Sequence, residues 1–406
     1  MSRLPCLIAL ILLAGSSGTA AAQAQAQGVE VTQLAAPDAF STPGRDTGLP
    51  PTLWAGASAR TAKTVLPLLA AKPLSPAAAA LARRILATGA PGPRDMGRDP
   101  ELAAARANAL MFQGDPKAAA RVLAHAPGLD RSSDLARAAA ESVLLSGDDQ
   151  RACQLAEGLT AGRDEVYWLK LRTYCQAIAG QTAQAQLTFD LVQAQVKDPT
   201  FTRLMSAKLA GGGNPGAASL RNGLDYALSK SLGLDLAAAR PSPAVAAALS
   251  AGDPAPPVFD AAGAAPEVAP LAEALVRGEP VREALLGALT ETAGSATDPK
   301  GRARGQAALL LAAAVSGAMT PEVRGQIAAL GVPEGKAPVG RDIALEAAAQ
   351  QKLMGEAALL SLWTCAEAGP AGLAMGDRVR IVRALHAVGL DADARALALE
   401  GLLALK

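Results

Sequence analysis

Residues 100–123 read PELAAARANALMFQGDPKAAARVL and carry the pattern that decides the fold. The pattern is a glycine followed five positions later by an alanine, and it recurs at equal intervals along the chain: Gly114 with Ala119, Gly147 with Ala152, and Gly180 with Ala185. Glycine permits the positive φ that ends a helix, and alanine lets two helices approach closely. Each unit is therefore predicted to be a helix, a tight turn and a second helix.

Apolar or small residues precede each glycine in steps of three, four and three, which places them on one helical face. The three stripes are Leu102, Ala105, Ala109 and Phe112; Leu135, Ala138, Ser142 and Leu145; and Trp168, Leu171, Cys175 and Ile178. After the glycines, Leu123, Ala156 and Phe189 occupy equivalent places in the second helices. The stripes predict one continuous core beneath stacked hairpins.

The repeat resembles the tetratricopeptide family in its Gly-Asp turns (Gly114-Asp115 and Gly147-Asp148), its small residue five positions on, and an apolar residue four beyond that. The family repeat is usually about 34 residues long, one more than here, and carries a Trp-Leu-Gly-Tyr signature that is largely absent from this chain. Ankyrin arrays share the 33-residue period, but their Thr-Pro-Leu-His turn is missing. The resemblance covers about residues 100–199 and implies an α-solenoid of helix-turn-helix hairpins.

Composition extends this all-α prediction to the rest of the chain. Half of the 406 residues are hydrophobic but only 3% are aromatic, which indicates closely approached helices and disfavours sheets. Helix starts are predicted at Ser75-Pro76, Asp198-Pro199 and Thr320-Pro321, and Gly389 with Ala394 repeats the turn pattern. A proline-rich linker at residues 251–270 divides a repeat array at 57–250 from a C-terminal helical block at 271–406.

Residues 1–22 have the three parts of a secretory signal: Arg3, an apolar run over residues 7–14, and small residues before the expected cleavage site. The mature chain is therefore expected in the periplasm or outside the cell. Residues 23–56 are expected to form a flexible lead-in. No later stretch has 18 uninterrupted apolar residues, so no transmembrane segment is expected after cleavage.

Three cysteines follow the leader. Cys153 and Cys175 lie on successive predicted helices, so they form either a disulfide or two small buried residues. Cys365 lies in an apolar run and is expected to be an inert core thiol.

The chain offers little for catalysis or for binding anions. Lys and Arg number 38 against 37 for Asp and Glu, a net charge of +1, which gives no basis for binding nucleic acid. The two histidines, His125 and His386, are isolated, and no Walker A loop, nucleophile elbow or metal-ligand spacing occurs. We therefore predict no catalytic residue, no cofactor and no metal ion.

The remaining candidate site is the inner wall of the predicted array, formed by the first helix of each unit. Trp168 belongs to the core stripe and is expected to pack inside. Polar and aromatic residues beside the stripes are either an ordinary solvated face or partner-binding candidates: Tyr167, Lys170, Tyr174, Arg137, Glu141 and Asn108.

These features predict an exported, non-catalytic scaffold that binds a protein or peptide partner in the cell envelope. The alternatives are a passive structural protein of the envelope and an all-helical toroid enzyme.

Overall fold

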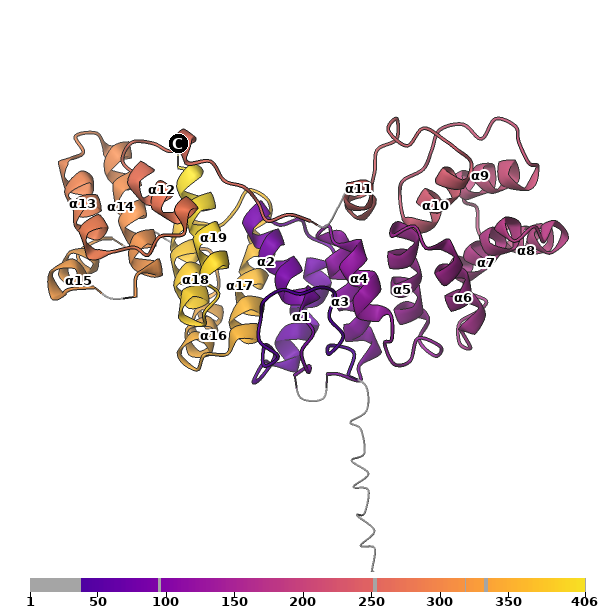
Figure 1. Cartoon of the computed structure of the whole chain (residues 1–406), viewed down its shortest axis with the longest axis horizontal. Coiled ribbons are helices and arrows are strands. Elements are labelled where there is room, and N and C mark those ends of the chain that lie inside the picture. The colour runs from indigo at the N-terminus through magenta and orange to yellow at the C-terminus, as the bar shows by residue number, and fades with distance from the viewer. Residues whose placement is uncertain (1–37, 94–95, 251–253, 318, 332–334, 406) are drawn as a thin grey trace, which may run out of the picture. The chain divides into compact units, whose positions relative to one another are not determined.

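The computed structural model describes residues 38–93, 96–250, 254–317, 319–331 and 335–405, and throughout these ranges the chain is helical without a β-strand (Figure 1). The predicted all-α class is confirmed. The predicted signal peptide at residues 1–22 and the start of the predicted lead-in lie outside the described residues. Within the described ranges, no helix has the length and apolar composition required to cross a bilayer.

The helices of the N-terminal half are α1 (Ala59–Leu69), α2 (Pro76–Ala87), α3 (Pro100–Phe112), α4 (Pro116–Leu123), α5 (Ser133–Leu145), α6 (Asp149–Gly158), α7 (Val166–Ile178), α8 (Thr182–Gln195), α9 (Pro199–Leu209), α10 (Gly223–Ser231) and α11 (Pro243–Leu249). The C-terminal half contains α12 (Ala269–Arg277), α13 (Glu283–Ser295), α14 (Pro299–Val315), α15 (Pro321–Ala328), α16 (Val339–Gln350), α17 (Met354–Ala368), α18 (Met375–Ala387) and α19 (Asp391–Leu403), and a short 3₁₀ helix lies at Ala261–Gly263. Helices α2, α9 and α15 begin at the prolines that the sequence marked.

The repeated glycines end the first helix of a hairpin, as predicted. Gly114, Gly147, Gly180 and Gly389 all have φ between +75° and +93°, the left-handed region. The next residue donates its amide to the carbonyl five positions earlier, for example Asp115 to Leu110 at 2.8 Å, which satisfies the helix end. Ala119, Ala152, Ala185 and Ala394 are each 0% exposed, because the two helices cross most closely there.

One hairpin carries no glycine at this place. Between α16 and α17 the left-handed residue is Lys352, with φ of 57°, and Leu353 donates to the Ala348 carbonyl at 2.9 Å. Ala357, five positions after Lys352, is fully buried. The Lys352 ammonium donates to the Ala387 carbonyl at the end of α18, 2.6 Å away. The hairpin geometry is therefore kept without the sequence signal.

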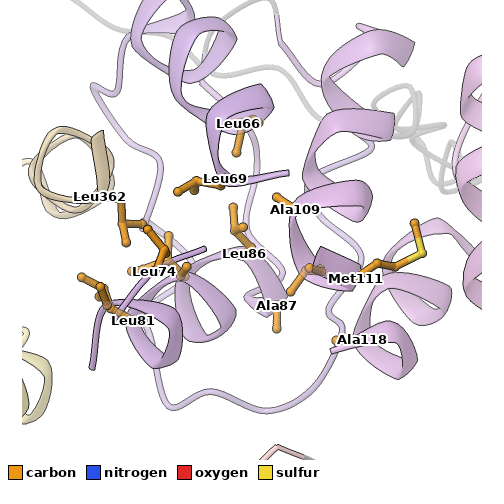
Figure 2. Packing of buried hydrophobic residues seen from close by; sticks show 14 of the residues in the cluster. Leu66, Leu69, Leu74, Leu81, Leu86, Ala87, Ala109, Met111, Ala118 and Leu362 are labelled. Atoms are coloured by element: carbon orange, nitrogen blue, oxygen red, sulfur yellow. The ribbon is translucent and has the colours of Figure 1, made fainter. Parts of the chain in front are cut away.

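The two predicted helical blocks pack on each other, since the described residues from 38 to 405 belong to one compact unit. Helix α17 packs on α1, and α19 packs on α2. The Glu356 carboxylate accepts hydrogen bonds from the Ser58 amide at 2.8 Å and the Thr61 hydroxyl at 2.7 Å. Figure 2 shows Leu362 of α17 among leucines of the α1–α2 region, so one core continues from the C-terminal block into the N-terminal helices.

The prediction of a flexible lead-in up to residue 56 is wrong for residues 38–56. Phe40, Leu53 and Trp54 are at most 1% exposed, and their burial outweighs the polar composition around them. The segment is held by Arg106 of α3, which is fully buried. Its guanidinium donates to the carbonyls of Ala39, Leu86 and Thr88 at 2.8–2.9 Å.

Burial lowers the pKa of Arg106 to about 9, and the Asp38 carboxylate acts in the opposite direction. The side chain therefore stays charged at neutral pH while its donors satisfy backbone acceptors that no solvent reaches. Two of these acceptors, the carbonyls of Leu86 and Thr88, lie at the C-terminus of α2, where the helix dipole favours a cation.

Replacing Ala185 with leucine tests the close approach of paired helices. The larger side chain has no room between α7 and α8, so Ala185→Leu should lower the free energy of unfolding by about 2 kcal/mol, measured by urea denaturation. The matched control is Ala183→Leu on the exposed face of the same helix, which should change it by less than about 0.5 kcal/mol. Equal effects of both substitutions would contradict the packing described here.

Replacing Arg106 with methionine keeps the volume but leaves buried carbonyls without donors. Arg106→Met should therefore cost about 3 kcal/mol or more of unfolding free energy. Arg131→Met is the control, because that side chain is 76% exposed and should be replaceable at little cost. Undiminished stability of Arg106→Met would show that the buried guanidinium does not hold the 38–56 segment.

Candidate binding groove

A groove of about 840 Å³ lies between α3 and α5, with the end of α1 and the starts of α10 and α11 at its margins. We call it the α3–α5 groove. Its polar lining consists of Glu101, Asn108, Asp134, Arg137, Glu141, Arg221, Asn222 and Ser242. Its apolar lining includes Pro67, Ala104, Ala105, Met111, Phe112, Ala138 and Leu145.

Three of the six predicted partner-binding residues, Asn108, Arg137 and Glu141, line this groove. Asn108 and Arg137 are exposed, and Glu141 is partly buried. The repeat explains why they meet: Asn108 and Glu141 lie one repeat apart and occupy the same position of α3 and α5. Glu101 and Asp134 form a second such pair, which was not predicted although the register of the repeat could have revealed it.

Glu141 holds the wall of the groove in place. Its carboxylate accepts a hydrogen bond from the Gly223 amide, 2.6 Å away, at the first residue of α10. The Asn222 side chain caps the same helix by accepting from the Asp225 amide at 2.8 Å. Burial raises the pKa of Glu141, although the Gly223 amide and the Tyr167 hydroxyl favour its charged form. The main role of Glu141 is therefore to cap the N-terminus of α10 and to fix this helix against α5.

Arg137 and Tyr167 form a stacked pair behind Glu141. The guanidinium carbon lies 4.8 Å from the centre of the Tyr167 ring, within the range of a cation–π contact. Tyr167 also meets Trp168 edge to face, with ring centres 5.1 Å apart. Burial and the Glu141 charge raise the pKa of Tyr167 well above its usual range, so the hydroxyl stays neutral. Tyr167 is therefore partly buried support for Arg137 and is not among the groove-lining residues.

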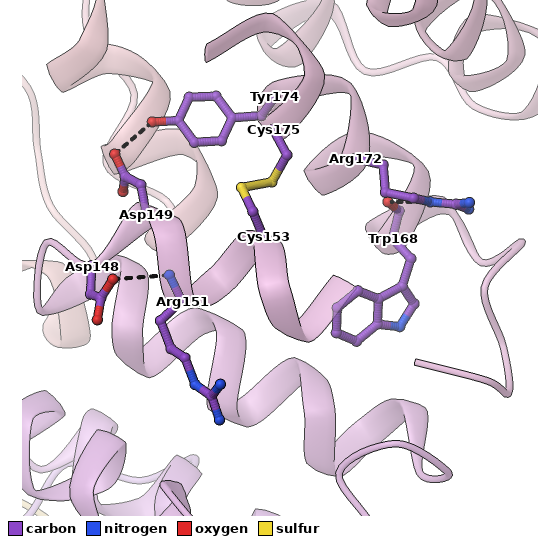
Figure 3. Close-up of a disulfide and its surroundings, with 8 residues drawn as sticks. All are labelled: Asp148, Asp149, Arg151, Cys153, Trp168, Arg172, Tyr174 and Cys175. Atoms are coloured by element: carbon purple, nitrogen blue, oxygen red, sulfur yellow. Dashed lines mark hydrogen bonds between the residues drawn. A yellow bond between two sulfur atoms is a disulfide. The ribbon is translucent and has the colours of Figure 1, made fainter. Parts of the chain in front are cut away.

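The expectation that Tyr174 and Lys170 project toward a groove is wrong. Tyr174 is fully buried and its hydroxyl donates to Asp149 at 2.9 Å (Figure 3). The Lys170 ammonium lies 2.7 Å from the Asp198 carboxylate and 5.3 Å from the centre of the Phe201 ring. Lys170 thus faces the start of α9, and Tyr174 lies between Asp149 of α6 and Ser231 of α10; no sequence signal marked these contacts.

Asp198 connects helix α9 and Arg221, which precedes α10, to helix α7. It caps α9 by accepting from the Phe201 amide at 3.2 Å, and it also receives Lys170 and Arg221. Partial burial acts to raise its pKa, but these hydrogen bonds outweigh burial and lower the pKa to about 2. Arg221, at the margin of the α3–α5 groove, is thereby linked to the third unit.

Cys153 of α6 and Cys175 of α7 form a disulfide with their Cα atoms 5.6 Å apart (Figure 3). A bridge that closes a loop of this length typically contributes about 3 kcal/mol by restricting the unfolded chain. Cys365 is a free, buried thiol whose pKa burial raises to about 12, which keeps it unreactive. Trp168 is buried as expected, and its indole N–H donates to the Ser133 hydroxyl at 2.8 Å.

Other polar residues have local structural roles. His125 is exposed, and His386 of α18 lies 2.5 Å from Asp391. In the part of the chain that the structure describes, no three histidine, cysteine, aspartate or glutamate side chains are grouped in a way that could hold a metal ion.

No family model, curated protein or solved structure matches this chain. The resemblance to tetratricopeptide repeats stays a prediction from the sequence. Function is therefore inferred from the geometry of the α3–α5 groove.

The pH dependence of unfolding tests the role of Asp198. Because the folded-state pKa lies below the ordinary value of 3.8, Asp198 adds stability that is fully present above about pH 4 and is lost as the pH falls toward 2. Asp198→Asn should be less stable than wild type at pH 7, and the difference should shrink between pH 4 and pH 2 in urea titrations. The exposed Asp190→Asn variant should follow wild type throughout; a pH-independent gap for Asp198→Asn would contradict the assignment.

Proposed function

We propose that the protein is an exported, non-catalytic helical-repeat scaffold that binds a segment of another envelope protein in the α3–α5 groove. The observation that carries the proposal is the coincidence of three sequence-selected positions, Asn108, Arg137 and Glu141, with one groove. Its volume of about 840 Å³ is in the range of sites that enclose a ligand or a short segment. Asn108 offers an amide that can donate to and accept from a peptide backbone.

Two further features support the location outside the cytoplasm. The first residues have the pattern of a secretory signal, and the Cys153–Cys175 bridge is of the kind that persists in oxidising compartments.

A toroid-type enzyme is the second candidate, because Glu101, Asp134 and Glu141 bring three carboxylates to one groove. Glu141, whose pKa is raised, is already used as an acceptor for the α10 amide, which removes it from a free acid role. We therefore favour binding over catalysis as the function of the α3–α5 groove.

Recovery of partners from an envelope extract tests the proposal. The mature chain and an Asn108→Ala/Arg137→Ala variant are immobilised, and bound proteins are quantified by mass spectrometry. A groove ligand should be recovered at least tenfold less by the variant, whose helical circular dichroism spectrum should match that of wild type. The control is Arg131→Ala/Gln193→Ala, which removes an exposed arginine and an exposed amide elsewhere and should recover the same proteins as wild type. Equal recovery by all three chains would overturn the groove assignment.

A further inference from the structure

We infer that the segment bound in the α3–α5 groove carries lysine or arginine side chains, and that Glu101 and Asp134 meet their positive charge. The inference rests on the proposed function and adds the chemistry of the partner. It follows from which charges of the groove are already neutralised and which are not.

Both cations of the groove have partners within the protein. Arg221 donates through Nε to Asp225 at 2.5 Å and through Nη2 to Asp198 at 3.2 Å. Arg137 lies over the Tyr167 ring and beside the Glu141 carboxylate. The charge of Arg221 is therefore matched by two carboxylates, and the charge of Arg137 is partly offset by Glu141.

The two exposed acidic residues of the groove differ from its arginines in their ion pairing. Glu101 and Asp134 are exposed, and no ion pair among the described residues includes either carboxylate. The nearby Lys63 ammonium pairs with Asp99, 2.9 Å away, and its charge reaches Glu101 only at longer range. The groove thus presents unneutralised negative charge to an occupant.

The repeat sets the spacing of these two carboxylates. Glu101 and Asp134 occupy the same position in the first turns of α3 and α5. Packed helices lie about 8–10 Å apart, so the two side chains project at about that interval. Residues three apart in a polyproline II segment lie on the same side of it and are separated by about 9 Å, which would allow two basic side chains to reach both carboxylates.

The floor of the groove suits the stems of such side chains. Ala104, Ala105 and Ala138 leave room near the carboxylates, and Phe112 and Leu145 supply apolar surface. Lysine and arginine bury their methylene stems on apolar surface while the charged end stays in water. The net charge of the whole chain is +1, so any preference for basic segments must come from this local arrangement.

An array of immobilised dodecapeptides of random sequence tests the inference with the full mature chain. Wild type should select peptides enriched in lysine and arginine at least twofold over the array average. Glu101→Gln/Asp134→Asn, which keeps the shape but removes the charge, should lose the enrichment. The control Glu157→Gln/Glu322→Gln neutralises two exposed carboxylates outside the groove and should retain it. Fluorescence anisotropy of a selected peptide should show at least tenfold weaker binding to the neutralised groove, and weaker binding of wild type at high salt.

Three results would overturn the inference: bound peptides no more basic than the array average, the same enrichment with the neutralised groove, or no bound peptide. The proposed function fails separately. If envelope partners depend on Asn108 and Arg137 but are recovered equally by Glu101→Gln/Asp134→Asn, the groove binds a partner and the charge inference is wrong. If no partner depends on the groove, the proposed function itself is wrong.

Discussion

The close approach of two helices at a buried alanine is the constraint on which the rest of the structure depends. At Ala119, Ala152, Ala185 and Ala394 no side-chain surface is exposed, and any larger residue would push the paired helices apart. Alanine also favours the helix itself. Such contacts bury little area per residue, so the core also needs larger buried groups. Trp54, Phe40 and the buried guanidinium of Arg106 supply them where the 38–56 segment is held.

The hairpins could be predicted because a left-handed turn and a close crossing each restrict residue type, and the two restrictions recur at one interval. Lys352 shows the limit of that reasoning. Its left-handed φ is tolerated because its ammonium meets the Ala387 carbonyl, a contact that depends on the neighbouring hairpin. The order of residues 38–56 was also hidden, since it depends on Arg106, which is far along the chain from its Ala39 acceptor. A local sequence pattern reveals constraints between residues close in the chain. The contacts of Lys352 and Arg106 join residues that are far apart in the chain, so no local pattern marks them.

Three of the six candidate site residues line the groove, and the other three do not. The reason is again the difference between a local pattern and a tertiary contact. Repeat register placed Asn108, Arg137 and Glu141 on one side of the helices, and all three line the α3–α5 groove. It also selected Lys170 and Tyr174 in the third unit, which contact α9 and α10, and Tyr167, which packs against Arg137. Nothing in the repeated pattern marks a segment that leaves the pattern and covers the preceding unit.

The covering segment also makes the groove. Glu141 caps α10 from α5, and Asp198 links Lys170 of α7 to Arg221 at the groove margin. Without α10 and α11, the inner faces of α3 and α5 would be open, and Glu141 would be one more solvated carboxylate. Since the two capping interactions hold the wall, the shape of the groove depends on groups outside its exposed surface. The carboxylates of the groove therefore differ in role: Glu141 positions the wall, whereas Glu101 and Asp134 are exposed and form no ion pair among the described residues.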